Sequence, residues 1–453
     1  MGNLKAGVSK VDITPPLGVD LSGYVLRDKP SEGVHDNLYT RALVLEDRGV
    51  GEKAVLVSAD LLGLSRESVE RIRREASEKT GIKPQNMIIA CTHTHSGPAT
   101  VNLRMLGEIN RKYLEAAEQK IIDSIVQASK DMEDAKISAG RGFVKGVGYN
   151  RDRRAEGPLD EELGVIRIDN SEGEVQCLVL NYACHPVILG PRNLLVSADY
   201  PGVATRTVEE RLAKCCIFTT GAAGDIDPLI NWKAWGKGTF KDVEEVGRMI
   251  GDEAVRVAEG LRGVSEVRIG SLQKVLELPV EPPPTIEEAR REVESAKEKL
   301  KALKLEGSEP GRIRIAEAMV QWAEDVLRHV EEGRFPRVNP VEVTLIGINE
   351  ILLVAVPGEL FVEIGLKIKR SSPFRHTYVI SYGNGLVGYF PTAESFKRGG
   401  YAPKEAPKYF GVTFLKPEAE HPRGGNTHPN QRTVRQTLEE KITPHNKPSK
   451  IIW

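Results

Sequence analysis

The chain has 453 residues, 40% of them hydrophobic and 28% charged, and its formal net charge at pH 7 is −1. A charge balance so near zero gives no electrostatic basis for binding nucleic acid or an anionic membrane surface. The five cysteines are an odd number without CxxC spacing, and the first ten residues contain no apolar run. We therefore expect reduced thiols in a cytoplasmic protein.

Strand-like and helix-like patterns alternate along the chain. Short runs rich in branched and aromatic residues predict strands, and they span residues 41–47, 53–60, 86–93, 163–169, 175–183, 215–221, 343–357 and 377–385. Apolar residues three and four positions apart predict helices over residues 65–81 and 110–132. This alternation predicts an α/β fold in which layered mixed β-sheets are flanked by helices.

Residues 284–334 differ in composition from the rest of the chain. They are rich in Glu, Lys, Ala and Arg, and "GSEPG" at residues 307–311 interrupts their helical pattern. This arrangement predicts a helical hairpin inserted between strands, with solvated charged faces.

The longest apolar run is "EILLVAVPGELFVEIGL" at residues 350–366. Pro357, Gly358 and Glu359 interrupt it, and an interrupted run of this kind does not cross a bilayer. We therefore expect no integral membrane segment.

The sequence after Glu420 has no apolar periodicity. This predicts an irregular C-terminal tail over residues 421–453. A second hypothesis is a frameshift in the coding sequence. Reverse translation of "PRGGNTHPNQRTVR" with a shift of one base permits "LVEETLTLIKELF", which has the pattern of an amphipathic helix.

Two histidines stand one residue apart where the apolar run 87–91 ends. On an extended chain, His93 and His95 would face the same side and point into one space. Strand ends are where α/β proteins place their chemistry, and imidazole is a common zinc ligand. The alternative is a pair of capping or core histidines.

Further metal-binding side chains follow other predicted strands. His185 ends the run "NYACH", Glu359 follows a Pro-Gly break, and Tyr389 lies in the glycine-rich stretch "GNGLVGYFP". Each could be structural by itself, but together with His93 they supply nitrogen and oxygen donors from four strand ends, as a catalytic zinc site requires.

The small-residue loop "TTGAAGDIDP" at residues 219–228 follows another strand. It is not a phosphate-binding loop, because no Lys-Ser or Lys-Thr follows it. Asp225 and Asp227 make it either a functional loop or a structural turn.

Seven motifs stand in an order found in one family of enzymes. They are "DITPPLGVDLSGY", "GVHDNLYTRALVL", "THTHSGP", "NYACHP", "GAAGDIDP", "PGE" and "GYFPTAESFKRGGY". They cover roughly residues 5–415 and resemble those of neutral ceramidases and their relatives. The resemblance implies a zinc-dependent amidase whose catalytic domain spans residues 1–420.

The resemblance also implies roles for single residues by motif matching. Four side chains would bind Zn²⁺, namely His93, His185, Glu359 and Tyr389. His95 would face the substrate. Arg151 in "GYNRDRR" and Tyr401 resemble other active-site residues of the family.

The chain departs from neutral ceramidases in three respects. Asp227 stands where they carry serine, and we expect no leader and no additional C-terminal β-sandwich in this chain. These departures favour a smaller or more polar amide than ceramide. A carboxylate at residue 227 would stay ionised beside zinc and repel anionic groups.

We expect a zinc-dependent hydrolase that cleaves a linear amide bond with metal-activated water. Its substrate would be a small-molecule or lipid-like amide, such as an N-acyl amine or N-acyl amino acid. Arg151, Tyr401 or His95 would stabilise the oxyanion, and His95 would give a proton to the leaving amine. Asp227 would orient the water or bind a cationic amine. A zinc esterase or lactonase and a non-catalytic metal-binding protein are the alternatives, and the oligomeric state is open.

Overall fold

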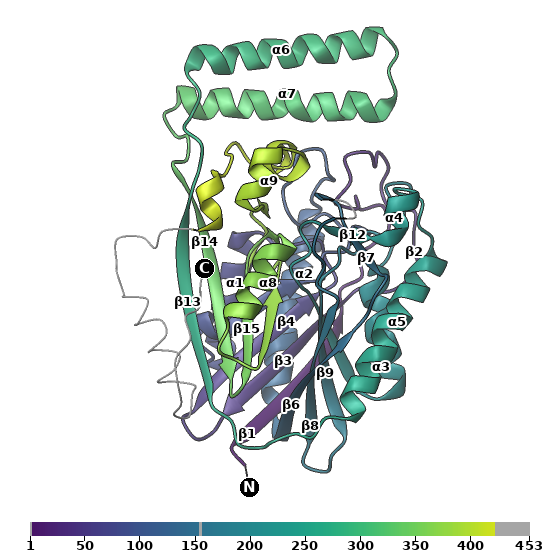
Figure 1. Ribbon diagram of the computed structural model, residues 1–453, viewed down its shortest axis with the longest axis vertical. Helices are drawn as coiled ribbons and strands as arrows, with labels where there is room; N and C mark the ends of the chain where they lie inside the picture. Colours follow the sequence, from purple (N-terminus) through teal and green to yellow (C-terminus); the bar gives the residue numbers. More distant parts are fainter. Residues whose placement is uncertain (1, 154–155, 422–453) are drawn as a thin grey trace.

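A mixed eight-stranded β-sheet forms the centre of the molecule in the computed structural model, which describes residues 2–153 and 156–421 (Figure 1). Its strands, in spatial order, are β11 (Cys215–Thr220), β9 (Val175–Tyr182), β8 (Glu162–Asn170), β6 (Glu133–Phe143), β1 (Leu4–Asp12), β3 (Tyr39–Asp47), β4 (Glu52–Ala59) and β5 (Met87–Cys91). The pairs β11/β9 and β4/β5 are parallel and the other neighbours are antiparallel. The predicted mixed α/β class is confirmed.

Two pairs of helices cover one face of this sheet. They are α1 (Arg66–Thr80) with α2 (Arg111–Lys130) and α3 (Asp199–Arg211) with α5 (Phe240–Glu259). The helix predicted at 65–81 begins after Ser65, which caps the amide of Ser68, and ends at Gly81 with φ 73°. Its apolar stripe, including Val69 and Ile72, packs with Ile121 and Ile125 of α2, so amphipathic periodicity sets which side faces the core.

A second, four-stranded sheet packs on the opposite face. Its order is β13 (Ile269–Pro279), β14 (Val338–Ile348), β15 (Ile351–Ala355) and β17 (His376–Ile380). Aliphatic side chains of both sheets meet in one core, for example Leu56 and Ile88 with Ile346 and Leu353. The single run predicted at 343–357 is in fact two strands, because Asn349 adopts φ 51° in a two-residue hairpin turn.

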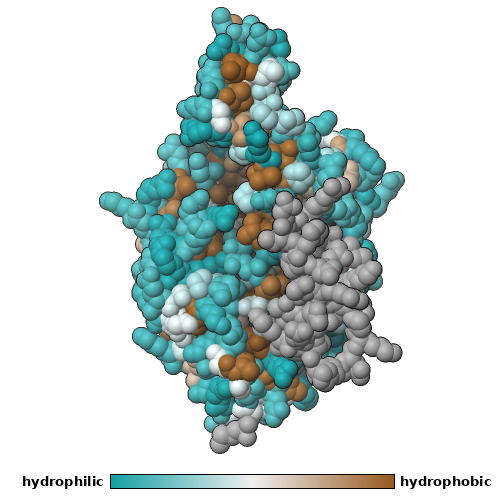
Figure 2. Space-filling view, turned by 90° about the vertical axis from the view of Figure 1, so that its left-hand side faces the viewer, coloured by the Kyte–Doolittle hydropathy of each residue, from teal (hydrophilic) through white to brown (hydrophobic). Residues whose placement is uncertain are grey.

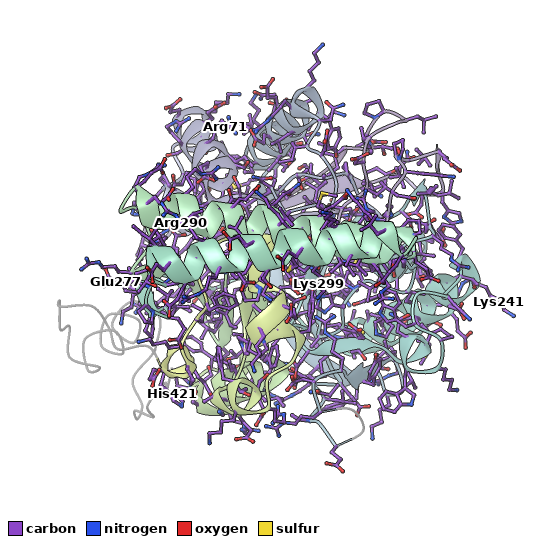
Figure 3. All side chains as sticks on the ribbon, turned by 90° about the horizontal axis from the view of Figure 1, so that it is seen from above. Arg71, Lys241, Glu277, Arg290, Lys299 and His421 are labelled. Atoms are coloured by element: carbon purple, nitrogen blue, oxygen red, sulfur yellow. The ribbon has the colours of Figure 1, made fainter. Side chains whose placement is uncertain are left out.

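The predicted helical hairpin consists of α6 (Ile286–Leu305) and α7 (Pro310–Glu331), which lie above the rest of the molecule (Figures 1 and 3). Thr285 and Glu288 form a capping box at the start of α6. The hairpin is inserted between β13 and β14, and the ion pair of Arg104 with Asp325 fixes α7 to the body.

Short elements connect the layers. They are β2 (Gly33–Val34), η1 (Pro84–Asn86), β7 (Gly148–Asn150), β10 (Leu195–Val196), β12 (Ile226–Pro228), α4 (Leu229–Lys233), β16 (Glu359–Leu360), α8 (Val362–Ser371), β18 (Tyr389–Phe390), α9 (Ala393–Arg398), η2 (Tyr401–Glu405), α10 (Pro407–Phe410) and η3 (Pro417–Glu420). Among the described residues, no helix is both long and apolar enough to cross a membrane.

All five cysteines are buried and free, as predicted. The division into a catalytic domain over 1–420 and a tail over 421–453 stays a prediction, because residues 422–453 lie outside the described part of the chain.

The carboxyl ends of strands from both sheets meet at one edge of the sandwich. After β17, the Ser381 amide donates to the carbonyl of Thr220 at the end of β11 (2.9 Å). The Thr220 hydroxyl in turn donates to the Thr92 carbonyl beyond β5 (2.7 Å). These bonds bring segments far apart in sequence into one loop layer, where the candidate site lies.

Candidate metal centre

His93 lies in a sharp turn after β5. The strand ends at Cys91, and His93 itself has φ 70°, so the argument from an extended chain was wrong. The rings of His93 and His95 nevertheless converge, with 3.2 Å between their Nε2 atoms. His93 is buried, and its Nδ1 lies 2.6 Å from the Leu62 carbonyl oxygen. The turn therefore produces the predicted convergence by another geometry.

His185 is held in the same way after β9. Its ring is fully buried, and its Nδ1 lies 2.6 Å from the carbonyl oxygen of Ala223. That carbonyl belongs to the small-residue loop after β11. The small side chains of this loop let its backbone approach the His185 ring. The Nε2 atom of His185 points at Glu359 Oε2, 2.9 Å away.

Glu359 and Tyr389 lie side by side on a two-residue parallel ladder. They are direct partners in the pairing of β16 with β18. A Cβ on Gly358 would lie 2.4 Å from the Gly388 carbonyl oxygen, so glycine is needed for this approach. The buried Glu359 Oε2 is 3.7 Å from His93 Nε2. The pairing of β16 with β18 and the bends after β5 and β9 thus bring together four residues, His93, His185, Glu359 and Tyr389.

The hydrogen bonds fix where the lone pairs of the histidines point. A carbonyl oxygen only accepts, so Nδ1 of His93 and of His185 must carry the proton, and each Nε2 presents a lone pair. Burial lowers the pKa of His93 to about 3 and that of His185 to about 3, so both rings are neutral at pH 7. Burial also raises the pKa of the Glu359 carboxyl.

Three electron-pair donors therefore face one another in a buried space. Such an arrangement is costly unless a cation lies between them. Donor atoms bound to one tetrahedral zinc ion are about 3.3 Å apart. Glu359 Oε2 lies 2.9 Å from His185 Nε2 and 3.7 Å from His93 Nε2. One distance is slightly shorter and the other slightly longer than this value. The donor set fits a metal ion.

His95 is a third imidazole beside this centre. The ligand atoms of His93, His95 and His185 all lie within 4.8 Å of one another, so a three-histidine site is also geometrically open. His95 differs in one respect, because its buried Nδ1 has no hydrogen-bond partner among the described residues. Metal-binding histidines are normally fixed through their other nitrogen, as His93 and His185 are. Burial, followed by the neighbouring His93 and His185, lowers the pKa of His95.

Arg151 links Tyr389 to Asp227. Its Nη1 donates to Asp227 Oδ1 (3.0 Å), and its Nη2 donates to the Tyr389 hydroxyl (2.9 Å) and the Gly224 carbonyl (2.8 Å). The Asp227 carboxylate is therefore paired with Arg151, and its expected repulsion of anionic groups stays a prediction. The Tyr401 ring lies 5.9 Å from the Tyr389 ring and is half exposed.

Asp225 has a structural place in the same loop. Its carboxylate accepts from the Val362 amide at the start of α8 and from the Asn150 side chain, both at 2.7 Å. Burial raises its pKa to about 6. It joins α8 and β7 to the loop and does not point at the metal centre's donors.

Tyr382 was missed by the sequence analysis. Its ring stacks on that of His93 with 3.7 Å between centroids and 7° between planes, and its hydroxyl lies 3.4 Å from His185 Nε2. The residue is buried and has φ 57°. Its place two residues after β17, at another strand end, is the signal that could have found it.

Comparisons with known proteins give a consistent set of relatives. The family model described as "Neutral/alkaline non-lysosomal ceramidase, N-terminal" matches residues 4–231. The neutral ceramidase of Pseudomonas aeruginosa is 24% identical over 458 residues, which cover 87% of this chain and 68% of that protein. The neutral ceramidase of Drosophila melanogaster is 28% identical over 228 residues, 46% of this chain and 32% of that protein.

A solved structure shares the fold. The crystal structure of the neutral ceramidase from Pseudomonas aeruginosa matches with a TM-score of 0.73 at 20% identity, covering 99% of this chain and 76% of that chain. The family match includes His93, His185 and Arg151, whereas Glu359 and Tyr389 lie beyond it.

Proposed function

Because this chain belongs to the neutral/alkaline non-lysosomal ceramidase family, we propose that it is a zinc-dependent hydrolase of a linear amide bond. The substrate class is an N-acyl amine or N-acyl amino acid. The observation that carries the proposal is the convergence of two buried imidazole lone pairs on the Glu359 carboxylate.

His93, His185, Glu359 and Tyr389 would hold the zinc ion. Two nitrogens and two oxygens are a donor set that zinc accepts. The carbonyls of Leu62 and Ala223 fix both imidazoles, and Arg151 fixes the Tyr389 hydroxyl. In the part of the chain that the structure describes, nothing supports His95 at Nδ1, which favours a role outside the ligand set.

A zinc ion bound there supplies Lewis acidity and makes water a nucleophile near neutral pH. His95 lies at the half-buried side of the centre, where its imidazole can pass a proton to the leaving amine. The Tyr401 side chain is half exposed, and its hydroxyl has no hydrogen bond to a described residue, so it can donate to the amide oxygen. Arg151 and Asp227 keep Tyr389 in place.

Aromatic side chains lead from the centre to the surface. The Tyr24 ring lies 5.0 Å from the His95 ring and 6.2 Å from the ring of Trp235, which is 53% exposed. Rings of this kind bury hydrocarbon well. They support a substrate with an apolar acyl chain, whose amide would reach the metal centre beside His95.

The test combines metal analysis with a matched substrate panel. The wild-type protein should contain one zinc ion and turn over N-acyl amines or N-acyl amino acids. His185→Ala should lose the metal, whereas His95→Ala should keep it and lose turnover. Faster turnover of matched esters or lactones would show that the same site belongs to an esterase or lactonase. Bound zinc without turnover of any of these substrates would indicate a non-catalytic protein and sink the proposal.

A further inference from the structure

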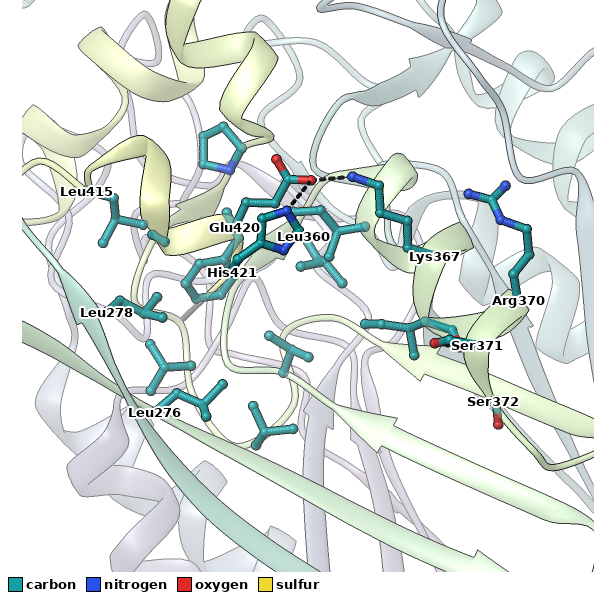
Figure 4. Close-up of a pocket in the computed structure, with 18 residues that line it drawn as sticks. Leu276, Leu278, Leu360, Lys367, Arg370, Ser371, Ser372, Leu415, Glu420 and His421 are labelled. Carbon is teal, nitrogen blue, oxygen red and sulfur yellow. Dashed lines mark hydrogen bonds and ion pairs between the residues drawn. The ribbon is translucent and has the colours of Figure 1, made fainter. Parts of the chain in front are cut away.

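An apolar groove lies on the outer face of the second sheet (Figure 4). Its volume is about 630 Å³, within the range of ligand-sized sites. Its walls are mainly aliphatic and include Leu276 and Leu278 of β13, Val341 and Val343 of β14, Ile368 of α8, and Phe390. Figure 2 looks at the side on which β13 and β14 lie in Figure 1, and hydrophobic residues gather along its middle.

Among residues 2–153 and 156–421, the helical layer over this sheet is incomplete. Helix α8 contacts β17 at one side, and η3 contacts β13 at the other. The groove lies between them, lined by Ile364 from α8 and Ala419 from η3. An apolar sheet face is stable only when another element covers it, so the groove needs an occupant with an apolar face.

The rim of the groove carries excess positive charge. Lys367 pairs with Glu420, whereas Arg370 forms no ion pair with any described residue. Both cations lie on α8, as Figure 4 shows. An occupant with acidic residues beside its apolar face would complement this rim.

The described chain ends at the groove, since His421 is one of its lining residues. The next fourteen residues, "PRGGNTHPNQRTVR", contain three arginines, two prolines, two glycines and one aliphatic residue, Val434. They have too little apolar surface to fill the groove, and their arginines carry the same sign of charge as Arg370 and Lys367. In the frame shifted by one base, the same stretch permits "LVEETLTLIKELF".

We propose that the groove is the docking site of an amphipathic C-terminal helix that the gene encodes one base out of frame with the sequence from Pro422 onward. The reading "LVEETLTLIKELF", one of those that codon degeneracy allows, has an aliphatic stripe at helical spacing. It also has three glutamates and one lysine, opposite in charge to the rim. At 1.5 Å per residue it spans about 20 Å, enough to cross β13 and β14 between η3 and α8.

Docking there would also support the metal centre, a consequence that rests on the proposed function. Leu360 and Phe390 line the groove and directly follow Glu359 and Tyr389 on β16 and β18. Successive strand residues point to opposite faces. A helix in the groove would therefore press on the back of the ladder that carries two of the proposed ligands.

The nucleotide sequence of the gene gives the first test. Read one base on from codon 422, it should encode a run with apolar residues three and four positions apart. A stop codon or a uniformly polar run there would overturn the proposal, whatever the protein does.

Protein variants give the second test. Residues 422–435 are replaced by the shifted segment, or by the same residues in an order that destroys the apolar stripe. The intact stripe should raise Tm by several degrees and lower the fluorescence of bound anilinonaphthalene sulfonate. Equal Tm values for the two chains would refute docking.

Reversing a charge at the rim distinguishes specific docking of the helix from a nonspecific rise in Tm caused by added apolar residues. Arg370→Glu should reduce the rise in Tm that the shifted segment gives. Arg375→Glu is the matched control, because Arg375 pairs with Glu350 and does not line the groove. Identical effects of both substitutions would contradict the charge complementarity on which the proposal depends.

Discussion

Replacing Asp227 by asparagine tests how the metal centre is held together. Asparagine keeps the size and one acceptor oxygen of Asp227, but it removes the charge that pairs with Arg151 at 3.0 Å. Arg151 stays charged, so its bond to asparagine is still a hydrogen bond to a charged group, and such bonds are worth about 1.5–3 kcal/mol. The substitution moves this bond from the upper towards the lower end of that range. Because a quarter of the Arg151 side chain is exposed, water compensates in part. We expect the free energy of unfolding to fall by about 1 kcal/mol.

Asp227→Asn should also weaken zinc binding. Arg151 keeps its bonds to the Gly224 carbonyl and the Tyr389 hydroxyl, but it loses the anion that orients it. Loss of an outer partner of a metal ligand costs about 10–100-fold in affinity. Since two of three anchors remain, we expect the lower end, about a tenfold weaker zinc affinity.

Competition with a chromophoric chelator measures this affinity, and urea denaturation of the metal-free proteins measures stability. Asp169→Asn is the matched control, because Asp169 is buried and pairs with Arg167 (2.7 Å) away from the centre. It should lose similar stability and keep its zinc affinity. An unchanged affinity in Asp227→Asn, or an equal fall in both variants, would falsify the assignment of Arg151 and Asp227 to the support of Tyr389.

Three further predictions follow from other parts of the molecule. Chelation should abolish turnover while circular dichroism still records a cooperative transition, because the cores around both sheets do not depend on one ion. Tyr382→Ala should cost about 3–5 kcal/mol by leaving a cavity against His93, whereas Tyr382→Phe, which keeps the stacked ring, should cost less than about 1.5 kcal/mol in urea denaturation. Burial raises the pKa of Asp199 to about 7 in the folded state. Its contribution to stability is therefore complete below the unfolded pKa of about 4 and is lost as pH rises through 7. Asp199→Asn, which mimics the protonated acid, should flatten that part of the pH–stability curve, and an unchanged slope would contradict the raised pKa.

The fold class and the location of the candidate site could be predicted from the sequence. The helices after Ser65 and Asn110 have clear caps and apolar stripes, so local patterns determine them. His185 and Glu359 each follow an apolar strand, and strand ends in layered α/β folds gather at one edge. The two strands within 343–357 were read as one run because their hairpin turn consists of only two residues, Asn349 and Glu350, with apolar residues on both sides.

The contacts that hold the site residues in place could not be predicted from the sequence. The carbonyls of Leu62 and Ala223 fix the two buried imidazoles, yet a backbone carbonyl carries no residue signature. The pairing of Arg151 with Asp227 joins residues 76 positions apart, and nothing in either motif indicates it. Tertiary packing alone decides such contacts.

His93 and His95 show how geometry distinguishes two residues of the same type. The two residues have the same chemistry and nearly the same place in the sequence, and both approach the centre. One ring is fixed by a carbonyl at Nδ1 and by stacking on Tyr382, in a backbone conformation that costs on the order of 1–3 kcal/mol. The other ring, that of His95, finds no partner at Nδ1 within residues 2–153 and 156–421. A fixed imidazole suits a ligand, and an imidazole free at one nitrogen suits a group that must release and regain a proton.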